Sequence, residues 1–105
     1  MLDFFVIFSK GGIVLWCFQN TQESYTLPIN DLIQNVIIPE KTFELQRKYK
    51  QLMLKYKLDN EFELVYVVGY QSAIQLSYVD KLLTDMQLFF RDRFKVYFIY
   101  LLNVV

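Results

Sequence analysis

The chain has 105 residues, and its 11 basic and 11 acidic side chains leave a net charge near zero. Apolar residues make up 54% of the chain and aromatic residues 18%, so a single packed domain is expected rather than a disordered chain. The charge balance disfavours direct nucleic-acid binding, because that activity selects a strongly basic surface.

The single cysteine, Cys17, has no partner for an internal disulfide, which is typical of a reducing compartment. A free cysteine inside an apolar run is expected to be a small buried residue. No basic segment precedes the apolar residues 4–8, so a secretory signal is not expected. The longest apolar run, residues 96–102, is far shorter than the ~20 residues of a membrane span. We therefore expect a soluble domain, or one held at a membrane by another component.

The first predicted element is a β-hairpin. Two runs rich in aromatic and β-branched residues, 2–8 and 13–18, flank a turn that contains Gly11 and Gly12. Glycine reaches positive φ without steric cost, which favours a tight turn between two strands. The almost unbroken apolar character predicts strands covered on both faces, with Trp16 in the core.

A helix is predicted next. After a polar loop over residues 19–26, Pro28 suits a first helical turn with Thr26 as a candidate N-cap. Pro39 should end the helix near Ile38. One face of this helix is apolar and consists of Ile29, Leu32, Ile33, Val36 and Ile37. Residues 40–51 are charged and lack a clean period, so a solvated loop and a short extra helix both remain open.

The second half predicts three strands and a helix. Residues 54–58 alternate strictly between apolar and basic, which is typical of a half-buried strand, and Asp59 and Asn60 can form the turn after it. The other predicted elements are a strand over 62–68, a turn over 69–72, a fifth strand over 73–78 and a helix from Val79 to about Lys95. The predicted fold is α+β, with a five-stranded, mainly antiparallel sheet and helices on both faces.

The sequence contains few of the residue types that catalysis usually requires. The chain has no histidine, which removes the usual general base and the commonest metal ligand. Asp59, Glu61 and Glu63 could suggest a carboxylate site, but a solvated face beside a turn explains them better. Gly11 and Gly12 lead into a strand and match no phosphate-loop pattern. No catalytic, cofactor-binding or metal-binding residue is therefore predicted.

Basic residues gather in the middle of the chain. A membrane-surface or acidic-partner patch is one interpretation. The other is a solubilising loop followed by an edge strand whose lysines block stray pairing. The residues concerned are Lys41, Arg47, Lys48, Lys50, Lys55 and Lys57.

Several stretches resemble one family in both wording and order. They are residues 1–5, 7–12 and 14–18 of the hairpin, followed by 54–60, 62–65, 67–69, 78–82 and 90–92. Together they resemble the N-terminal SRX domain of signal recognition particle receptor alpha subunits. This resemblance implies a longin-like fold, the SNARE-like architecture also found in trafficking proteins.

The resemblance also implies a function. An SRX domain docks onto the GTP-bound beta subunit, a membrane-anchored small GTPase, and so holds the receptor at the cytoplasmic face of the endoplasmic reticulum. There the receptor meets signal recognition particle and ribosome during co-translational protein targeting. GTP would be bound by the partner subunit and by the family's GTPase domain, and this chain would carry no cofactor and no enzymatic activity.

The resemblance divides the chain into two parts. Residues 1–95 form the expected SRX domain, whereas residues 96–105 form an apolar tail that does not resemble the family. The family's final helix is therefore expected to be missing or replaced. Residues 41–51 also match the family poorly, as a variable loop would.

A partner-binding rim is predicted from the longin strand order two-one-five-four-three. If the fourth predicted strand runs parallel to the first, their ends share one rim. An alternative contact is the outer face of the first helix, at Asn30 and Gln34. The rim would consist of Lys10, Gly11, Gly12, Gly69, Tyr70 and Gln71.

Two other functions stay open at this point. A longin-type vesicle-trafficking or adaptor subunit would share the fold but not the opening motif. A small hydrolase would use Asp59 or Glu63 as its base.

Overall fold

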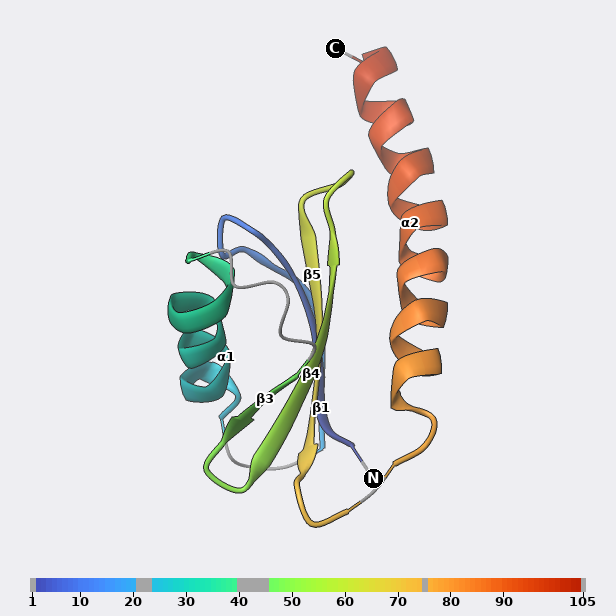
Figure 1. Cartoon of the computed structure of the whole chain (residues 1–105). Helices are drawn as coiled ribbons and strands as arrows, with labels where there is room; N and C mark the ends of the chain where they lie inside the picture. Colours follow the sequence, from blue (N-terminus) through green and yellow to red (C-terminus); the bar gives the residue numbers. More distant parts are fainter. Residues whose placement is uncertain (1, 21–23, 40–45, 75, 105) are drawn as a thin grey trace.

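The computed structural model describes residues 2–20, 24–39, 46–74 and 76–104, with side chains described as far as Arg93 (Figure 1). Five strands and two long helical segments follow one another along the chain. They are β1 (Leu2–Ser9), β2 (Val14–Gln19), α1 (Thr26–Leu32) with its π-helical continuation η1 (Ile33–Ile37), β3 (Gln46–Tyr49), β4 (Leu52–Asp59), β5 (Leu64–Gln71) and α2 (Val79–Val104).

The strands form one antiparallel sheet in the order β2-β1-β5-β4-β3. Figure 1 shows the sheet edge-on, with α1 on one side and α2 on the other. The predicted α+β fold class is confirmed. The strand order has the expected form, but the strand beside β1 is β5 and not the predicted strand at 73–78. Strands β1 and β5 lie at the centre, and most of their residues are buried because helices cover both faces of the sheet there.

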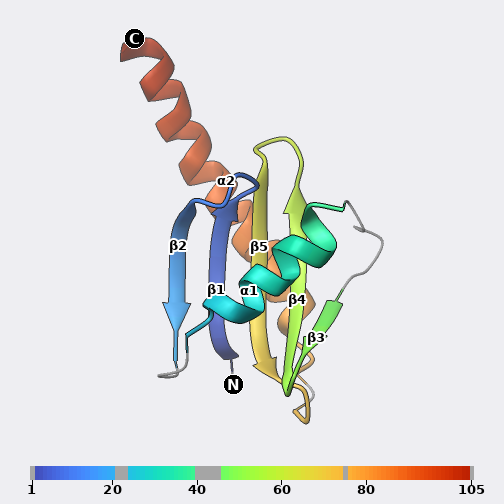
Figure 2. The same ribbon diagram turned by 90° about the vertical axis from the view of Figure 1, so that its left-hand side faces the viewer.

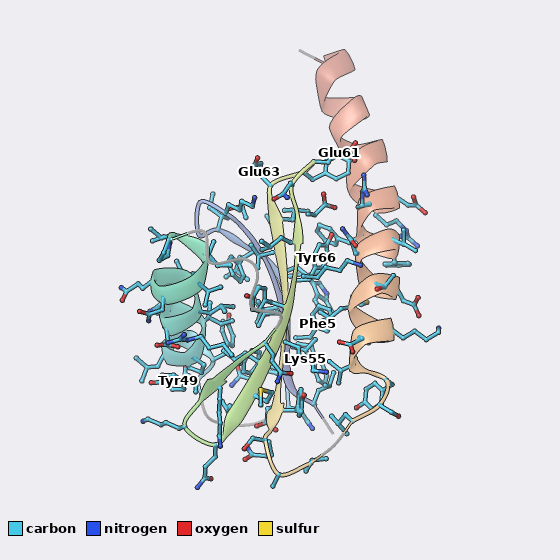
Figure 3. All side chains as sticks on the ribbon, viewed as in Figure 1. Phe5, Tyr49, Lys55, Glu61, Glu63 and Tyr66 are labelled. Atoms are coloured by element: carbon cyan, nitrogen blue, oxygen red, sulfur yellow. The ribbon has the colours of Figure 1, made fainter. Side chains whose placement is uncertain are left out.

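Two hydrophobic cores lie on the two faces of the sheet. Alternate residues of a strand point to opposite faces of the sheet, so β1 and β5 contribute to both cores. The core under α1 contains Phe4, Val6, Phe8, Ile29, Leu32, Val36, Leu54, Tyr56, Val65 and Val67. The core under α2 contains Phe5, Ile7, Leu64, Tyr66, Val68, Tyr70, Val79 and Leu83. Figure 3 shows Phe5 and Tyr66 between the sheet and α2.

The first helix buries the face that its spacing predicts. Ile29, Leu32 and Val36 are buried against the sheet. Its start differs, because Tyr25 holds the N-cap position while Ser24 Oγ accepts the Thr26 N–H at 3.1 Å. Thr26 is therefore the first helical residue rather than the cap. The last turn is π-helical and ends just before Ile38, as Pro39 predicts.

The strand assignment in the second half is corrected. A strand, β3, lies at Gln46–Tyr49, inside the segment predicted as a loop or helix. The described residues between 73 and 78 form no strand, because β5 continues to Gln71 and the chain then turns toward α2. The short polar β3 carries no alternating apolar signal, since it lies at an edge of the sheet. Residues 40–45, with Lys41, lie outside the described part.

The prediction that both hairpin strands are buried is correct for β1 and wrong for β2. Every residue of β2 is exposed, including Trp16 and Cys17, which were expected in the core. The cause is position: β2 forms the outer edge of the sheet, and α2 packs on β4 and β5 instead (Figure 2).

The helix α2 continues beyond the predicted end at Lys95 and reaches Val104. Its first turns lie along the sheet, and its C-terminal turns extend past the sheet (Figure 1). It crosses the predicted boundary between residues 95 and 96 as one uninterrupted helix. Within the described ranges, no helix is apolar over a long enough stretch to cross a membrane.

Candidate docking surface

The structure does not bring the six residues of the predicted rim together. Strands β1 and β5 run antiparallel, so the turn after β1 and the end of β5 lie at opposite ends of the sheet. The prediction failed because a fifth strand at 73–78 was counted and β3 was not, which reversed the direction assigned to the strand beside β1. The role of these residues in partner binding stays a prediction.

At one end of the sheet, Lys10 joins the two hairpin turns. Its Nζ donates to Asn60 Oδ1 at 2.5 Å and lies 3.6 Å from Glu63 Oε2. Its backbone N–H donates to the Glu63 carbonyl oxygen at 2.9 Å. Gly11 and Gly12 next to it are exposed, and Gly12 has φ +97°, which explains the glycine there. The Lys10 side chain is thus held by contacts within the domain.

At the other end of the sheet, the three remaining residues of the predicted rim make contacts within the domain. Gly69 lies opposite Phe4, and Tyr70 is buried at the end of β5. Gln71 Nε2 donates to Asp3 Oδ2 at 2.8 Å. This group therefore contributes mainly packing, and Gln71 is its exposed member.

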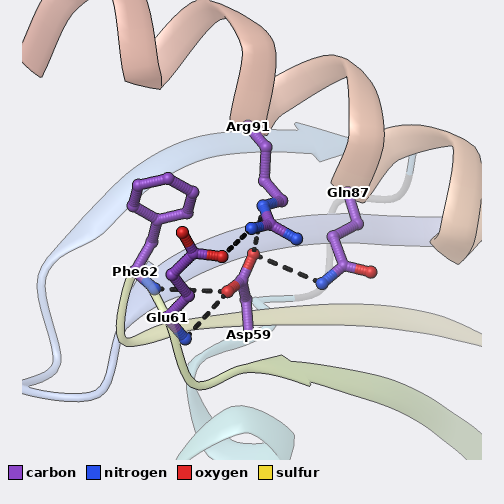
Figure 4. A network of polar contacts seen from close by, with 5 residues as sticks. All are labelled: Asp59, Glu61, Phe62, Gln87 and Arg91. Atoms are coloured by element: carbon purple, nitrogen blue, oxygen red, sulfur yellow. Dashed lines mark hydrogen bonds and ion pairs between the residues drawn. The ribbon is translucent and has the colours of Figure 1, made fainter.

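Among the described residues, Asp59 is the one buried carboxylate, with only 3% of its surface exposed (Figure 4). Its Oδ1 accepts the backbone N–H groups of Glu61 at 3.1 Å and Phe62 at 3.2 Å. Its Oδ2 accepts from Gln87 Nε2 at 3.3 Å and lies 3.4 Å from Arg91 Nε. Arg91 also pairs with Glu61. The carboxylate therefore links the β4–β5 turn to α2.

This arrangement does not support a hydrolytic site. A cavity of about 160 Å³ beside this network is lined by Glu61, Phe62, Leu88, Arg91 and Asp92, and Asp59 is not among these residues. Glu63 is exposed and pairs with Lys10. Among the pockets lined by described residues, none is therefore lined by either of the two carboxylates proposed as a base.

The feature that sequence reasoning missed is an exposed apolar surface on β2. We call it the β2 surface, and it consists of Ile13, Val14, Leu15, Trp16, Cys17 and Phe18. Ile13 is 67% exposed and Trp16 is 42% exposed. The uncharged run of residues 11–22 contains this surface and could have indicated it from the sequence. Apolar patches of this kind on soluble proteins mark interaction sites.

The two faces of the β2 surface have different neighbours. On the α2 side, the Trp16 ring packs edge-on against Phe5, with 5.8 Å between ring centroids. On the α1 side, Val14 lines a cavity of about 180 Å³ with Phe8 and Tyr25. A hydrogen bond with Cys17, together with burial, raises the pKa of the Tyr25 hydroxyl. Both faces of the β2 surface therefore expose apolar side chains, with the Tyr25 hydroxyl as a polar group on the α1 side.

These features define a class: a longin-like, non-catalytic interaction domain with one apolar edge. The family model "Signal recognition particle, alpha subunit, N-terminal" matches residues 27–100. The chain belongs to this family, which selects the receptor over a vesicle-trafficking or adaptor subunit.

Individual relatives agree with the family model. The chain is 54% identical over 95 residues to the signal recognition particle receptor subunit alpha of mouse and of human, covering 90% of this chain and 15% of each relative. It is 44% identical over 96 residues to the Drosophila melanogaster homolog, covering 90% of this chain and 16% of that protein. It thus spans about 15% of the mammalian receptors' length. The matched region is the non-catalytic N-terminal module, and the receptors' GTPase domain lies outside it.

Two solved structures show the same fold. A structure of the mammalian SRP receptor matches with a TM-score of 0.58 and 52% identity, covering 91% of this chain and 72% of that one. The SRb-GTP/SRX complex from Chaetomium thermophilum matches with a TM-score of 0.72 and 27% identity, covering 87% and 76%. The second structure contains a domain of this kind in complex with a GTP-bound partner.

Proposed function

We propose that this chain is the docking module through which a signal recognition particle receptor alpha subunit binds its GTP-bound beta subunit. The observation that carries the proposal is the likeness to the SRX domain of the SRb-GTP/SRX complex, at a TM-score of 0.72. The beta subunit is expected to be a small GTPase, so nucleotide would bind to the partner and not to this chain.

The surface of the chain supports a docking role. The β2 surface exposes six apolar side chains to solvent. Such a patch is costly in water unless a partner covers it. The balanced charge of the chain also fits a protein partner better than a nucleic acid.

The biological consequence follows from the partner. A membrane-anchored beta subunit would hold the alpha subunit at the cytoplasmic face of the endoplasmic reticulum. The receptor would meet signal recognition particle and ribosome there, and this domain would contact them only indirectly. The domain would then act in co-translational targeting as an attachment point, with GTP on the beta subunit as the condition for attachment.

The direct test is affinity for the beta subunit in its two nucleotide states. The immobilised 105-residue chain is incubated with beta subunit loaded with a non-hydrolysable GTP analogue or with GDP. We expect binding to the GTP form to be about ten-fold or more tighter, which corresponds to roughly 1.4 kcal/mol. Equal affinity for the two forms, or no binding to either, would contradict the proposed function.

A further inference from the structure

The outer edge of the sheet at β2 lacks the features that normally prevent strand pairing. Natural edge strands carry charged residues, proline or a covering element. Residues 11–20 contain no charge and no proline, and the described helices pack elsewhere. Figure 2 shows β2 at one side of the sheet, with α1 crossing β1, β5 and β4.

The opposite edge provides an internal comparison. Strand β3 has the sequence Gln46-Arg47-Lys48-Tyr49, with two cations in four residues. Arg47 forms an ion pair with Asp31 at 2.6 Å, and Lys48 is exposed. The two edges of the same sheet therefore differ: β3 is protected by charge and β2 is not. The difference indicates that β2 pairs with something in the functional protein.

The backbone of β2 is suited to such pairing. The Asn20 N–H donates to the Asp3 carbonyl oxygen at 2.8 Å. Because hydrogen-bonding direction alternates along an antiparallel strand, Trp16 and Phe18 also direct their backbone groups toward β1. Cys17, between them, directs its N–H and C=O away from the sheet. An added strand could therefore bond to Cys17 while apolar side chains flank it on both faces.

We propose that the beta subunit docks by adding a strand of its own to β2, so that one sheet continues across the interface. This inference rests on the proposed function and specifies where and how the partner binds. The uncharged edge requires an uncharged, extended partner segment, because a charge placed against it would lose its hydration without compensation. An open sheet in the partner would supply such an edge, and main-chain bonds would provide the affinity.

Two variants test the two parts of this inference. Leu15→Lys places a charge on the exposed edge, and Cys17→Pro removes the outward N–H at a position where an edge strand tolerates proline. Each should weaken binding to the GTP-loaded beta subunit by about ten-fold or more. The matched control for Leu15→Lys is Gln46→Lys on the β3 edge, which should stay within about two-fold. Cys17→Ser keeps the N–H and is the reference for Cys17→Pro, which should bind about ten-fold or more weakly than Cys17→Ser does.

The outcomes separate the inference from the proposed function. If the unchanged chain binds and the folded β2 variants bind equally well, the docking edge is overturned. If Leu15→Lys weakens binding but Cys17→Pro does not, the partner contacts the side chains of β2 without pairing with its backbone, and the inference of strand addition is wrong. If the unchanged chain binds neither nucleotide form, the proposed function is contradicted. The inference that the beta subunit pairs with β2 is then contradicted as well.

Two further measurements complete the experiment. Sedimentation of the chain alone reports its oligomeric state, and a dimer that Leu15→Lys dissociates would overturn the beta subunit in favour of a second copy. Thermal unfolding of each variant shows whether it folds. If Leu15→Lys does not fold, the comparison of Cys17→Pro with Cys17→Ser decides the outcome, because the two differ mainly in the backbone donor.

Discussion

Gly69 shows how a single residue type is set by its neighbour across the sheet. It lies within β5, near the C-terminal end of the strand and directly opposite Phe4 of β1. A Cβ atom at this position would lie 2.3 Å from the Phe4 ring, and Phe4 is itself buried. The glycine is therefore required by close packing in a strand and not by a turn.

We expect Gly69→Ala to destabilise the protein by about 1–3 kcal/mol, because the buried Phe4 ring has little room to move. The control is Gly11→Ala, where a Cβ would meet only Ser9 Oγ at 3.7 Å. Urea unfolding of both variants measures the effect. Equal unfolding midpoints for Gly69→Ala and Gly11→Ala would show that the ring accommodates the extra methyl group.

At the scale of elements, α2 is attached to the sheet by both apolar and polar contacts. Val79 and Leu83 are buried against β5, and the Phe90 ring packs edge-on against Tyr66 at 6.2 Å. Asp59 then joins the β4–β5 turn to Gln87 and Arg91 of the helix. A buried carboxylate of this kind is favourable only while its partners remain in place.

Asp59→Asn should cost about 2–3 kcal/mol of stability, because the amide loses the ion pair with Arg91 and leaves that guanidinium without its buried partner. The matched control is Asp85→Asn on the outer side of α2, where the pair with Lys81 is exposed. Chemical unfolding followed by circular dichroism measures both. A change no larger than that of the control would mean that water replaces the lost contacts.

At the scale of the whole molecule, one buried hydroxyl makes the stability of the protein sensitive to alkaline pH. Tyr66 is fully buried, and its hydroxyl has no hydrogen-bond partner in the described part of the structure. Burial, together with the nearby negative charge of Asp59, raises the pKa of Tyr66 to about 12 from its usual 10. The folded state therefore holds its proton more tightly than the unfolded state does.

The sign of the pH effect follows. Below about pH 10 tyrosine is neutral in both states, so the full stability is present. Between about pH 10 and 12 only the unfolded state ionises, so the free energy of unfolding should fall as the pH rises. Tyr66→Phe should remove this part of the pH dependence and should be neutral or slightly stabilising at neutral pH. Parallel losses of stability in the two proteins above pH 10 would contradict this assignment.

Local sequence patterns were sufficient for much of the fold. The glycine turn between β1 and β2, the apolar face of α1 and the start of α2 at Val79 follow from side-chain period and turn chemistry, which act over a few residues. The opening motif also indicated the family, which the comparisons confirm. The short strand β3 was missed because its four residues, which include two cations, carry no hydrophobic alternation.

The order of strands in the sheet determined which strand is exposed and which of the predicted site residues lie close together. Sequence pattern shows that β1 and β2 are both apolar, but only the pairing of β1 with β5 makes β1 central and leaves β2 at the edge. The same pairing separates Lys10 from Gln71 by the length of the sheet. Such pairing joins residues far apart in the chain, so no local pattern encodes it. The sequence by itself thus determined which residues are apolar, and the tertiary structure decided that those of β2 remain exposed.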